Sequence, residues 1–140
     1  MLMENFKSHS REETVALGEQ FGRSLKKGSI IAMKGGLGAG KTAFTAGIAI
    51  GLGIPENYVC SPTFSIVNEY TFGDVTMYHF DMYRVMNEES LESTGFFDYP
   101  LDEAVTVIEW SENIEKYLPK NIITVTIDTV GENERIINIT

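Results

Sequence analysis

The feature that most constrains this sequence is a glycine-rich run at residues 35–42. It reads Gly35-Gly36-Leu37-Gly38-Ala39-Gly40-Lys41-Thr42 and satisfies the Walker A pattern GxxxxGK[ST] without a mismatch. The apolar run 29–34 before it is bounded by glycines and predicts a buried strand. A helix is predicted after it, from about residue 40 to 52, closed by Gly53 and Pro55. Because strand, glycine loop and helix follow one another as this motif requires, a merely flexible glycine turn is disfavoured.

Each part of the run has a physical task in holding phosphates. Glycines let the backbone wrap closely, so that successive N–H groups point at the α- and β-phosphates, and the helix N-terminus adds the positive end of its dipole. Lys41 can reach the β- and γ-phosphates, and the Thr42 hydroxyl can ligate Mg²⁺. The run therefore predicts a site for a nucleotide with its magnesium ion.

Such a site also needs an acidic residue at the end of a neighbouring strand. Asp81 follows the segment 77–80, and Glu109 follows the more apolar segment 105–108. We assign Glu109 to the metal, since its longer carboxylate would reach Mg²⁺ directly or through water. Asp81 would then position the attacking water as a general base. From spacing alone the two roles could be exchanged.

Four further features have a functional and a structural interpretation. His79 shares a strand face with Asp81, but no third metal ligand is near in sequence, which favours a hydrogen-bonded histidine. Arg84 could act as an arginine finger or form an ion pair with the acidic segment that follows. The segment 61–63, Ser-Pro-Thr, could be a switch that senses the γ-phosphate or a simple proline turn. Trp110 is interpreted as a core or interface aromatic rather than a platform for base stacking.

The N-terminal part predicts one helix beside the glycine run. Ser10-Arg11-Glu12-Glu13 is typical of a capping box, and Gly28 stops the helix. If this helix packs beside the loop, Ser10 and Arg11 could contact the adenine or ribose, although capping alone explains Ser10.

The remaining segments predict a sheet that cannot be purely parallel. Residues 64–70 and 75–80 form one predicted hairpin, with its turn at 71–74. A second hairpin joins 122–128 to 135–139. Between them we expect a short helix over 88–94 capped by Asn87, a strand over 104–108, and a helix capped by Ser111. Residues 1–140 are therefore interpreted as one α/β domain, a P-loop NTPase-like fold of three layers with a mixed (parallel plus antiparallel) sheet.

Charge limits the partners of the chain. It has 11 Lys and Arg against 20 Asp and Glu, a formal net charge of −9. Residues 1–85 have 8 acidic and 8 basic side chains, whereas residues 86–140 have 12 and 3. Unaided binding to a nucleic-acid backbone is therefore not expected, because that affinity comes from basic residues. The single cysteine, Cys60, and the absence of a signal peptide or a long apolar run lead us to expect a cytoplasmic protein without membrane contact.

Taken together, four motifs closely resemble the TsaE (YjeE) family of small bacterial ATPases. They are residues 37–42 (LGAGKT), 61–64 (SPTF), 79–84 (HFDMYR) and 109–110 (EW), in this order and spacing. The resemblance covers essentially the whole chain. It implies Mg²⁺-dependent ATP hydrolysis in a P-loop fold, together with the subunits TsaD and TsaB. That system places a threonylcarbamoyl group on N6 of adenosine 37 in tRNAs that read codons beginning with A.

The resemblance also implies roles for individual residues. Lys41 and Asp81 match catalytic positions, and Thr42 and Glu109 match metal-binding positions. The implied ATP-binding residues are Ser10, Arg11, Gly36, Leu37, Gly38, Ala39, Gly40, Lys41, Thr42 and Ala43. Two departures occur, because Gly36 stands where the family commonly has Asp and Ala43 where a second Thr is usual.

Other functions remain as alternatives. A small-molecule kinase would need a lid and an acceptor pocket, for which 140 residues leave little room. A GTPase is disfavoured because no Asn-Lys-x-Asp motif occurs. A nucleotide-gated binding module without useful turnover remains open. For the function that the family resemblance implies, the acidic last 55 residues predict a carboxylate-rich surface for the protein partners, and those partners would supply most of the contact with tRNA.

Overall fold

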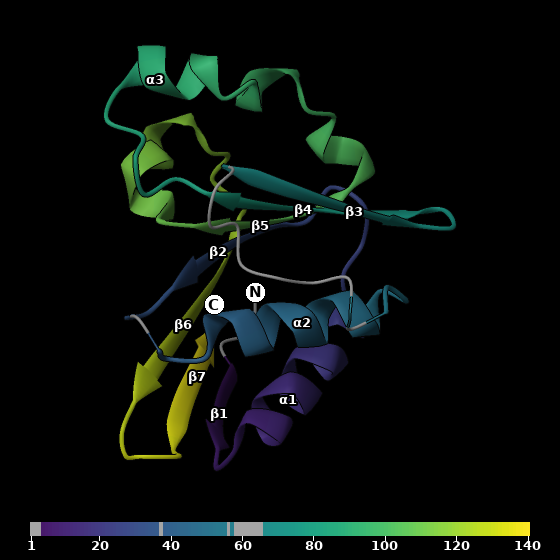
Figure 1. The fold of residues 1–140 in the computed structure, drawn as a ribbon, viewed down its shortest axis with the longest axis vertical. Coiled ribbons are helices and arrows are strands. Elements are labelled where there is room, and N and C mark those ends of the chain that lie inside the picture. Colours follow the sequence, from purple (N-terminus) through teal and green to yellow (C-terminus); the bar gives the residue numbers. More distant parts are fainter. Residues whose placement is uncertain (1–3, 37, 56, 58–65) are drawn as a thin grey trace.

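The computed structural model describes residues 4–36, 38–55, 57 and 66–140, in which seven strands form one mixed sheet (Figure 1). Along the sheet the order is β1-β7-β6-β2-β5-β4-β3. The strands are β1 (Glu4–Ser8), β2 (Ile30–Lys34), β3 (Val67–Phe72), β4 (Val75–Asp81), β5 (Val105–Glu109), β6 (Ile123–Thr129) and β7 (Arg135–Ile139). Strand β2 runs parallel to β5 and β6, and β4 runs parallel to β5. The other three pairings are antiparallel. The predicted mixed sheet is confirmed.

Parallel pairing brings the chemically important strand ends to one edge of the sheet. Asp81 at the end of β4 lies opposite Glu109 at the end of β5, and Glu109 lies opposite Met33 of β2. The glycine-rich run begins at Gly35, directly after Lys34 at the end of β2. Because ligands of open α/β sheets bind beyond the carboxyl ends of the strands, this edge is the expected place for a site.

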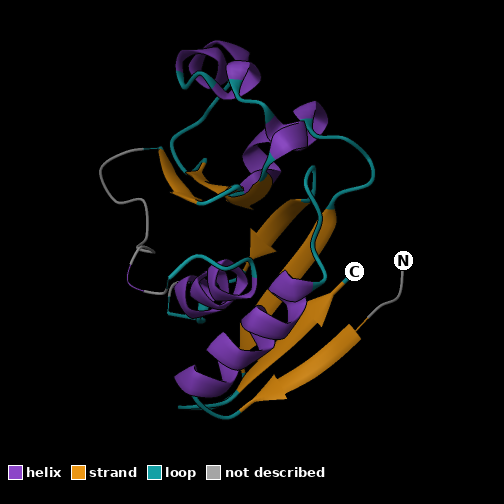
Figure 2. Ribbon diagram, turned by 90° about the vertical axis from the view of Figure 1, so that its right-hand side faces the viewer, coloured by secondary structure: helices purple, strands orange, loops and turns teal. Residues whose placement is uncertain are grey.

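Helices cover both faces of the sheet (Figure 2). Helices α1 (Arg11–Arg23) and α2 (Lys41–Gly51) lie on one face. The short helix α3 (Glu88–Ser93) and the 3₁₀ helices η2 (Phe96–Asp98), η3 (Leu101–Glu103) and η4 (Ser111–Tyr117) lie on the other. Each face has its own apolar core, and the buried strand β5 contributes Val107 to one and Ile108 to the other. This two-sided burial explains why β5 is almost continuously apolar.

Helices α1 and α2 pack with their backbones in contact. A Cβ atom at Gly47 of α2 would lie 2.2 Å from the Val15 carbonyl oxygen, and one at Gly18 of α1 would lie 2.3 Å from the Phe44 carbonyl oxygen. Gly22 and Gly51 are equally confined. No larger residue fits at these positions, so glycines set the distance between the helices. The close packing holds the first turn of α1 beside the N-terminus of α2.

Several predicted boundaries differ from the structure. Strand β1 was not expected, since its five residues show no apolar alternation. Thr71 and Phe72 belong to β3 rather than to a turn, because they pair with Thr76 and Val75. Ser111 does not cap a helix: it is the first residue of η4, which has Trp110 as its N-cap and no side-chain cap. None of the helices in the described residues has the length and apolar character needed to span a bilayer.

Candidate functional site

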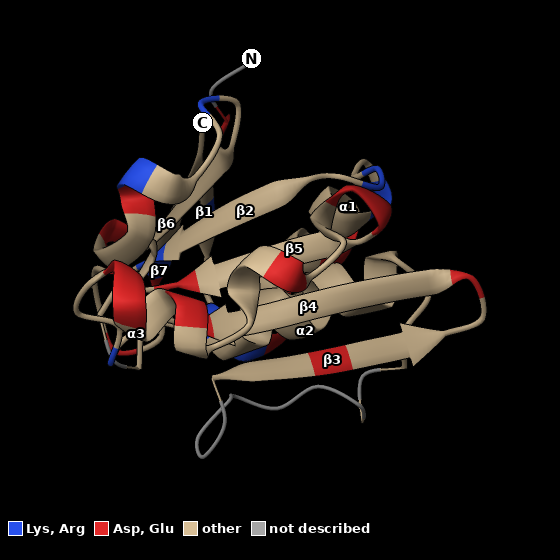
Figure 3. Ribbon diagram, turned by 90° about the horizontal axis from the view of Figure 1, so that it is seen from above, with Lys and Arg blue, Asp and Glu red and all other residues tan. Residues whose placement is uncertain are grey.

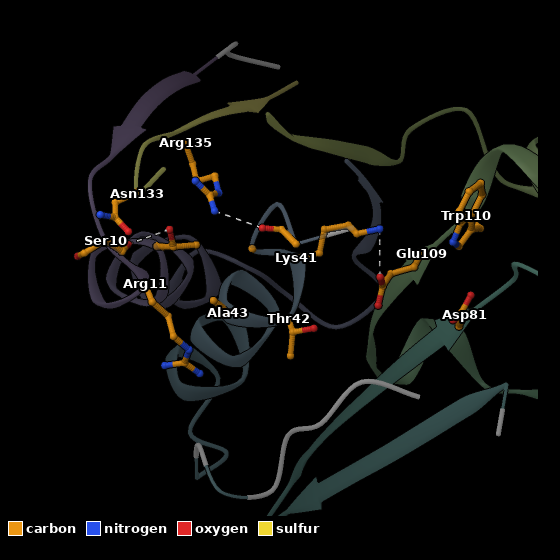
Figure 4. A pocket seen from close by; sticks show the side chains of 13 residues that line it. Ser10, Arg11, Lys41, Thr42, Ala43, Asp81, Glu109, Trp110, Asn133 and Arg135 are labelled. Atoms are coloured by element: carbon orange, nitrogen blue, oxygen red, sulfur yellow. Dashed lines mark hydrogen bonds and ion pairs between the residues drawn. The ribbon is translucent and has the colours of Figure 1, made fainter. Parts of the chain in front are cut away.

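A cavity of about 620 Å³ lies at the carboxyl edge of the sheet, between the start of α1, the glycine loop and the ends of β4 and β5 (Figure 4). Nine of the predicted site residues line it: Ser10, Arg11, Gly38, Gly40, Lys41, Thr42, Ala43, Asp81 and Glu109. Four segments that are far apart in sequence thus meet here, and the ends of β4 and β5 come together as the strand-end argument predicts. Gly36 and Ala39 are not lining residues, and Leu37 lies outside the described residues.

The glycine loop leads directly into α2. Gly40 is the N-cap residue and has φ = 103°, a left-handed conformation that favours glycine. Its carbonyl accepts the first helical hydrogen bond, from the Phe44 N–H at 2.9 Å. Helix α2 therefore begins at Lys41, with its N-terminal amide groups and positive dipole end at the cavity. This arrangement suits an anion.

Glu109 is the centre of a buried polar chain. Its Oε1 atom lies 3.5 Å from Lys41 Nζ, and its Oε2 atom lies 2.6 Å from His79 Nε2. Burial would raise the pKa of Glu109, but the hydrogen bond with His79 and the charges of His79 and Lys41 together lower it below its usual value. Glu109 is therefore ionised at neutral pH and accepts, so His79 Nε2 must be the donor. Lys41, which sequence reasoning assigned to phosphates, holds this carboxylate in the structure.

His79 is a hydrogen-bonded core histidine, as predicted. Its side chain is 0% exposed, and its Nδ1 atom has no partner among the described residues. Within the same part of the chain, no three His, Cys, Asp or Glu residues are grouped to hold a metal ion. The transition-metal alternative for His79 and Asp81 thus has no support. What His79 does instead is fix the orientation of Glu109.

Asp81 completes the acidic end of the cavity. It lies beside Glu109 in the register of β4 and β5, and its Oδ1 atom accepts a hydrogen bond from the Tyr83 N–H at 2.9 Å. This contact orients the carboxylate, which lines the cavity (Figure 4). Asp81 and Glu109, the two predicted acidic residues, therefore lie next to each other. Their contacts do not show which of them would orient the attacking water and which would hold the metal ion.

Trp110 lies at the rim of the cavity rather than in the core. Its side chain is 37% exposed, its ring meets that of Tyr83 edge-on at 4.9 Å, and Lys41 Nζ is 6.0 Å from its centroid. It is also the one residue other than glycine with positive φ, at 58°, in the described part of the chain. Strained conformations of this kind persist where the surroundings enforce them, often at functional sites.

The first turn of α1 forms another wall. The Ser10 hydroxyl accepts from the Glu13 N–H at 3.1 Å, which confirms the cap. The Glu13 carboxylate accepts from the His9 N–H at 3.3 Å, one residue earlier than in a standard capping box. Arg11 and Thr14 line the cavity beside Ser10. Helix α1 thus packs beside the glycine loop. This was the condition under which the sequence predicted that Ser10 and Arg11 could contact the adenine or ribose.

Two other predictions remain, for Arg84 and for the segment 61–63. Arg84 is exposed and is not a lining residue, and it forms no ion pair within the described part of the chain. The segment 61–63 lies outside the described residues.

Sequence reasoning missed three lining residues: Thr14 on α1, Asn133 on the turn that joins β6 to β7, and Arg135, the first residue of β7. The Arg135 guanidinium binds the glycine loop, with Nη2 3.2 Å from the Gly38 carbonyl oxygen (Figure 4). One signal was available. Arg135 is the single arginine among residues 86–140, a stretch with only three basic side chains.

Comparison with known proteins decides the family. The model of the family described as "Threonylcarbamoyl adenosine biosynthesis protein TsaE" matches residues 8–137. The chain belongs to the TsaE family. The resemblance inferred from the four motifs is thereby confirmed. TsaE of Bacillus subtilis is 40% identical over 129 residues, 92% of this chain and 80% of that protein. TsaE of Treponema pallidum is 36% identical over 132 residues, 94% of this chain and 96% of that protein.

A solved structure also matches the fold of this chain. The crystal structure of Bacillus subtilis YdiB superposes with a TM-score of 0.76 at 31% sequence identity, covering 99% of this chain and 84% of that one. The likeness extends over the whole seven-stranded sheet and its helices. The α/β fold with a mixed sheet is therefore that of its relatives.

Proposed function

We propose that this protein is a Mg²⁺-dependent P-loop ATPase that supports threonylcarbamoylation of adenosine 37 in tRNA. It would act with TsaD-like and TsaB-like subunits and sustain their turnover without transferring the threonylcarbamoyl group itself. Family membership supports the role in threonylcarbamoyl adenosine biosynthesis. The observation that carries the ATPase proposal is the meeting of Lys41, Glu109 and Asp81 at the N-terminus of α2 in one cavity.

Nucleotide phosphates would bind at the glycine loop and the first turn of α2. There they would compete with Glu109 for Lys41, since the Glu109 Oε1 atom lies 3.5 Å from Lys41 Nζ. The phosphates offer Lys41 several negative oxygens in place of one carboxylate oxygen. Transfer of Lys41 to the phosphates would leave Glu109 held by His79 alone on the protein side, at 2.6 Å.

The residues present fit a magnesium ion. Mg²⁺ prefers oxygen ligands and is commonly held by one or two carboxylates together with substrate phosphates. Thr42 and Glu109 would hold it, and both line the cavity. When bound, the ion supplies positive charge against the phosphates. Asp81, next to Glu109 in register, would orient the attacking water and accept its proton, although the contacts also allow these two acids to exchange roles.

The base end of the nucleotide is proposed to lie against α1. Ser10 and Arg11 line the cavity at the end away from Glu109, as Figure 4 shows. Ser10 already serves as the helix cap, so its contribution to binding would come with little reorganisation. Gly36, Leu37 and Ala39 would contribute through the backbone of the loop, and Ala43 through the first turn of α2.

The first prediction tests this assignment by hydrolysis. Protein mixed with Mg-ATP and the two partner subunits should release phosphate, and Lys41→Ala or Glu109→Ala should abolish release. Lys120→Ala, which removes an exposed lysine, is the matched control and should keep full activity. Phosphate release measured by a coupled assay decides, and unchanged turnover in both site variants would refute the assignment.

A hydrolysis-dead Asp81→Asn variant separates an ATPase from a nucleotide-gated binding module. If it binds ATP yet fails to sustain tRNA modification in cells, hydrolysis is required. Normal modification in those cells would instead favour gating by binding alone. A phosphate-transfer screen against small metabolites tests the kinase alternative in the same preparations.

A further inference from the structure

Arg135, the first residue of β7, joins the C-terminal hairpin to the glycine loop. Its Nε atom donates to the Ala39 carbonyl at 3.1 Å, and its Nη2 atom donates to the Gly38 carbonyl at 3.2 Å. Its Nη1 atom donates to carbonyls of its own turn, including Glu134 at 2.9 Å and Gly131 at 3.2 Å. One guanidinium thus binds the main chain of its own turn and that of the glycine loop, whose residues Ala39 and Gly38 are 96 and 97 positions away in sequence.

Arginine is chemically suited to this bridge. A guanidinium has five N–H donors in a rigid planar fork, so one edge can serve the loop while the other serves the turn. A lysine ammonium keeps the charge but places its three donors on a single atom. Lysine therefore cannot satisfy both groups of carbonyls together.

The backbone of Arg135 is itself well fixed. It lies between two strands, opposite Ser8 of β1 and Thr129 of β6. The neighbouring Glu134 forms an ion pair with Lys7 of β1 at 2.8 Å. The guanidinium therefore extends from a strand that is paired on both sides, which makes it a firm support for the loop.

We propose that Arg135 is a positioning residue that sets the orientation of the glycine loop before nucleotide arrives. In a trans peptide the C=O of one residue and the N–H of the next point in opposite directions. Because the Gly38 and Ala39 carbonyls are turned toward Arg135, the N–H groups of Ala39 and Gly40 are turned away from it. Without Arg135 these two peptide planes can rotate and present carbonyl oxygens where an anion is to bind.

The functional part of this inference rests on the proposed phosphate site, whereas the support of the loop does not. In the loop itself the Ala39 N–H closes a turn onto the Gly36 carbonyl at 3.2 Å. Arg135 and this turn act on the same peptide, from its two sides. Loss of the guanidinium should therefore loosen the loop even when no nucleotide is present.

The test compares Arg135→Lys and Arg135→Ala with the wild-type protein, both without ligand and with ATP. Hydrogen exchange followed by mass spectrometry should show amide exchange in residues 36–44 about tenfold faster in both variants, as expected for the loss of a charge-assisted hydrogen bond. The affinity for ATP should fall about tenfold or more in Arg135→Lys, despite the retained charge. Arg23→Lys, at an exposed arginine paired with Glu19 on α1, is the control and should change neither.

Each outcome has a defined meaning. Unchanged loop exchange in Arg135→Lys overturns the proposal, and if ATP affinity falls nonetheless, Arg135 contacts the nucleotide directly. Wild-type affinity for ATP in Arg135→Lys overturns the positioning role. If the wild-type protein binds no ATP, the proposed function fails, and the ligand-free exchange still decides whether Arg135 supports the loop. Circular dichroism checks folding, and Arg135→Lys serves if Arg135→Ala does not fold.

Discussion

Two adjacent glycines at the start of the loop have opposite constraints. Gly35 has φ = 150°, and a Cβ atom there would lie 2.5 Å from the Ile127 carbonyl oxygen of β6. Gly36 does not have positive φ, and nothing lies within 4 Å of its Cβ position. The first glycine is required by the fold, whereas the second is not.

This contrast gives the second prediction. Gly35→Ala should lower the free energy of unfolding by about 1–3 kcal/mol, through the clash with β6 and the strained backbone. Gly36→Asp, which introduces the residue that the family resemblance implied for this position, should leave it within about 0.5 kcal/mol. Urea unfolding of the ligand-free variants measures both. Equal losses at the two positions would contradict the geometry.

Tyr78 gives the third prediction, which concerns alkaline pH. Burial first, and then the nearby carboxylate of Glu69, raise the pKa of Tyr78 above 10.0. The folded state therefore favours the protonated phenol, and its contribution to stability is complete below pH 10 and is lost as the pH rises through the folded pKa. As the pH rises above about 10, the wild-type protein should lose stability faster than Tyr78→Phe. Urea unfolding over a pH series measures the stability of both proteins. If the two curves of stability against pH are parallel, Tyr78 does not cause the loss at alkaline pH.

At the scale of elements, the contact between α1 and α2 depends on glycine. The fourth prediction is that Gly47→Ala destabilises the protein by about 1–3 kcal/mol, because its methyl group would meet the Val15 carbonyl. This loss should appear even though alanine is the better helix former by about 1 kcal/mol. Gln20→Ala at an exposed position of α1 is the control and should be close to neutral. Thermal and urea unfolding measure both variants, and a stabilised Gly47→Ala would mean that the helices are not in backbone contact.

Elements with a strong local pattern could be predicted from the sequence. Strand β2, helix α2 and strand β5 were expected within one or two residues of their observed bounds, because apolar runs and glycine ends are local signals. Their strand-end geometry then brought Lys41, Asp81 and Glu109 together as expected. Most of the candidate site could therefore be predicted from local sequence patterns.

Features that depend on distant pairing could not be predicted. Strand β1 exists because it pairs with β7, more than 120 residues away, and its own sequence is mostly polar. The contacts of Arg135 follow from that same pairing. The left-handed conformation of Trp110 likewise depends on its surroundings. The sequence predicted a helix cap at Ser111, and this was wrong, because Trp110 is the N-cap of η4.

At the scale of the whole molecule, part of the acidic charge of residues 86–140 lies on one set of short helices. Acidic positions recur along α3 and the short helices beside it (Figure 3). Of the 12 acidic side chains in residues 86–140, only Glu109 belongs to the buried part of the site. Apart from Glu134, which pairs with Lys7, the others are available for a protein partner with basic side chains.

The fifth prediction is that association with the TsaD-like and TsaB-like subunits weakens as salt is raised. Exposed charges are largely screened beyond about 8–10 Å at physiological ionic strength, so the affinity should fall steadily with added NaCl. Glu88→Gln combined with Glu89→Gln on α3 should reduce this dependence. Glu12→Gln on α1 is the matched control. Calorimetric titration over a salt series measures the effect, and salt-insensitive binding would remove the acidic region from the interface.

Because β1 pairs with β7, and Arg135 of β7 contacts the glycine loop, these parts of the fold form only after β7 has been synthesised. On the ribosome, β1 emerges before its partner β7 has been made, and the glycine loop emerges before Arg135. A nascent chain that has completed α2 therefore still lacks the side chain that holds two of its loop carbonyls. The proposed binding of nucleotide should therefore become possible only after the hairpin of β6 and β7 has left the exit tunnel.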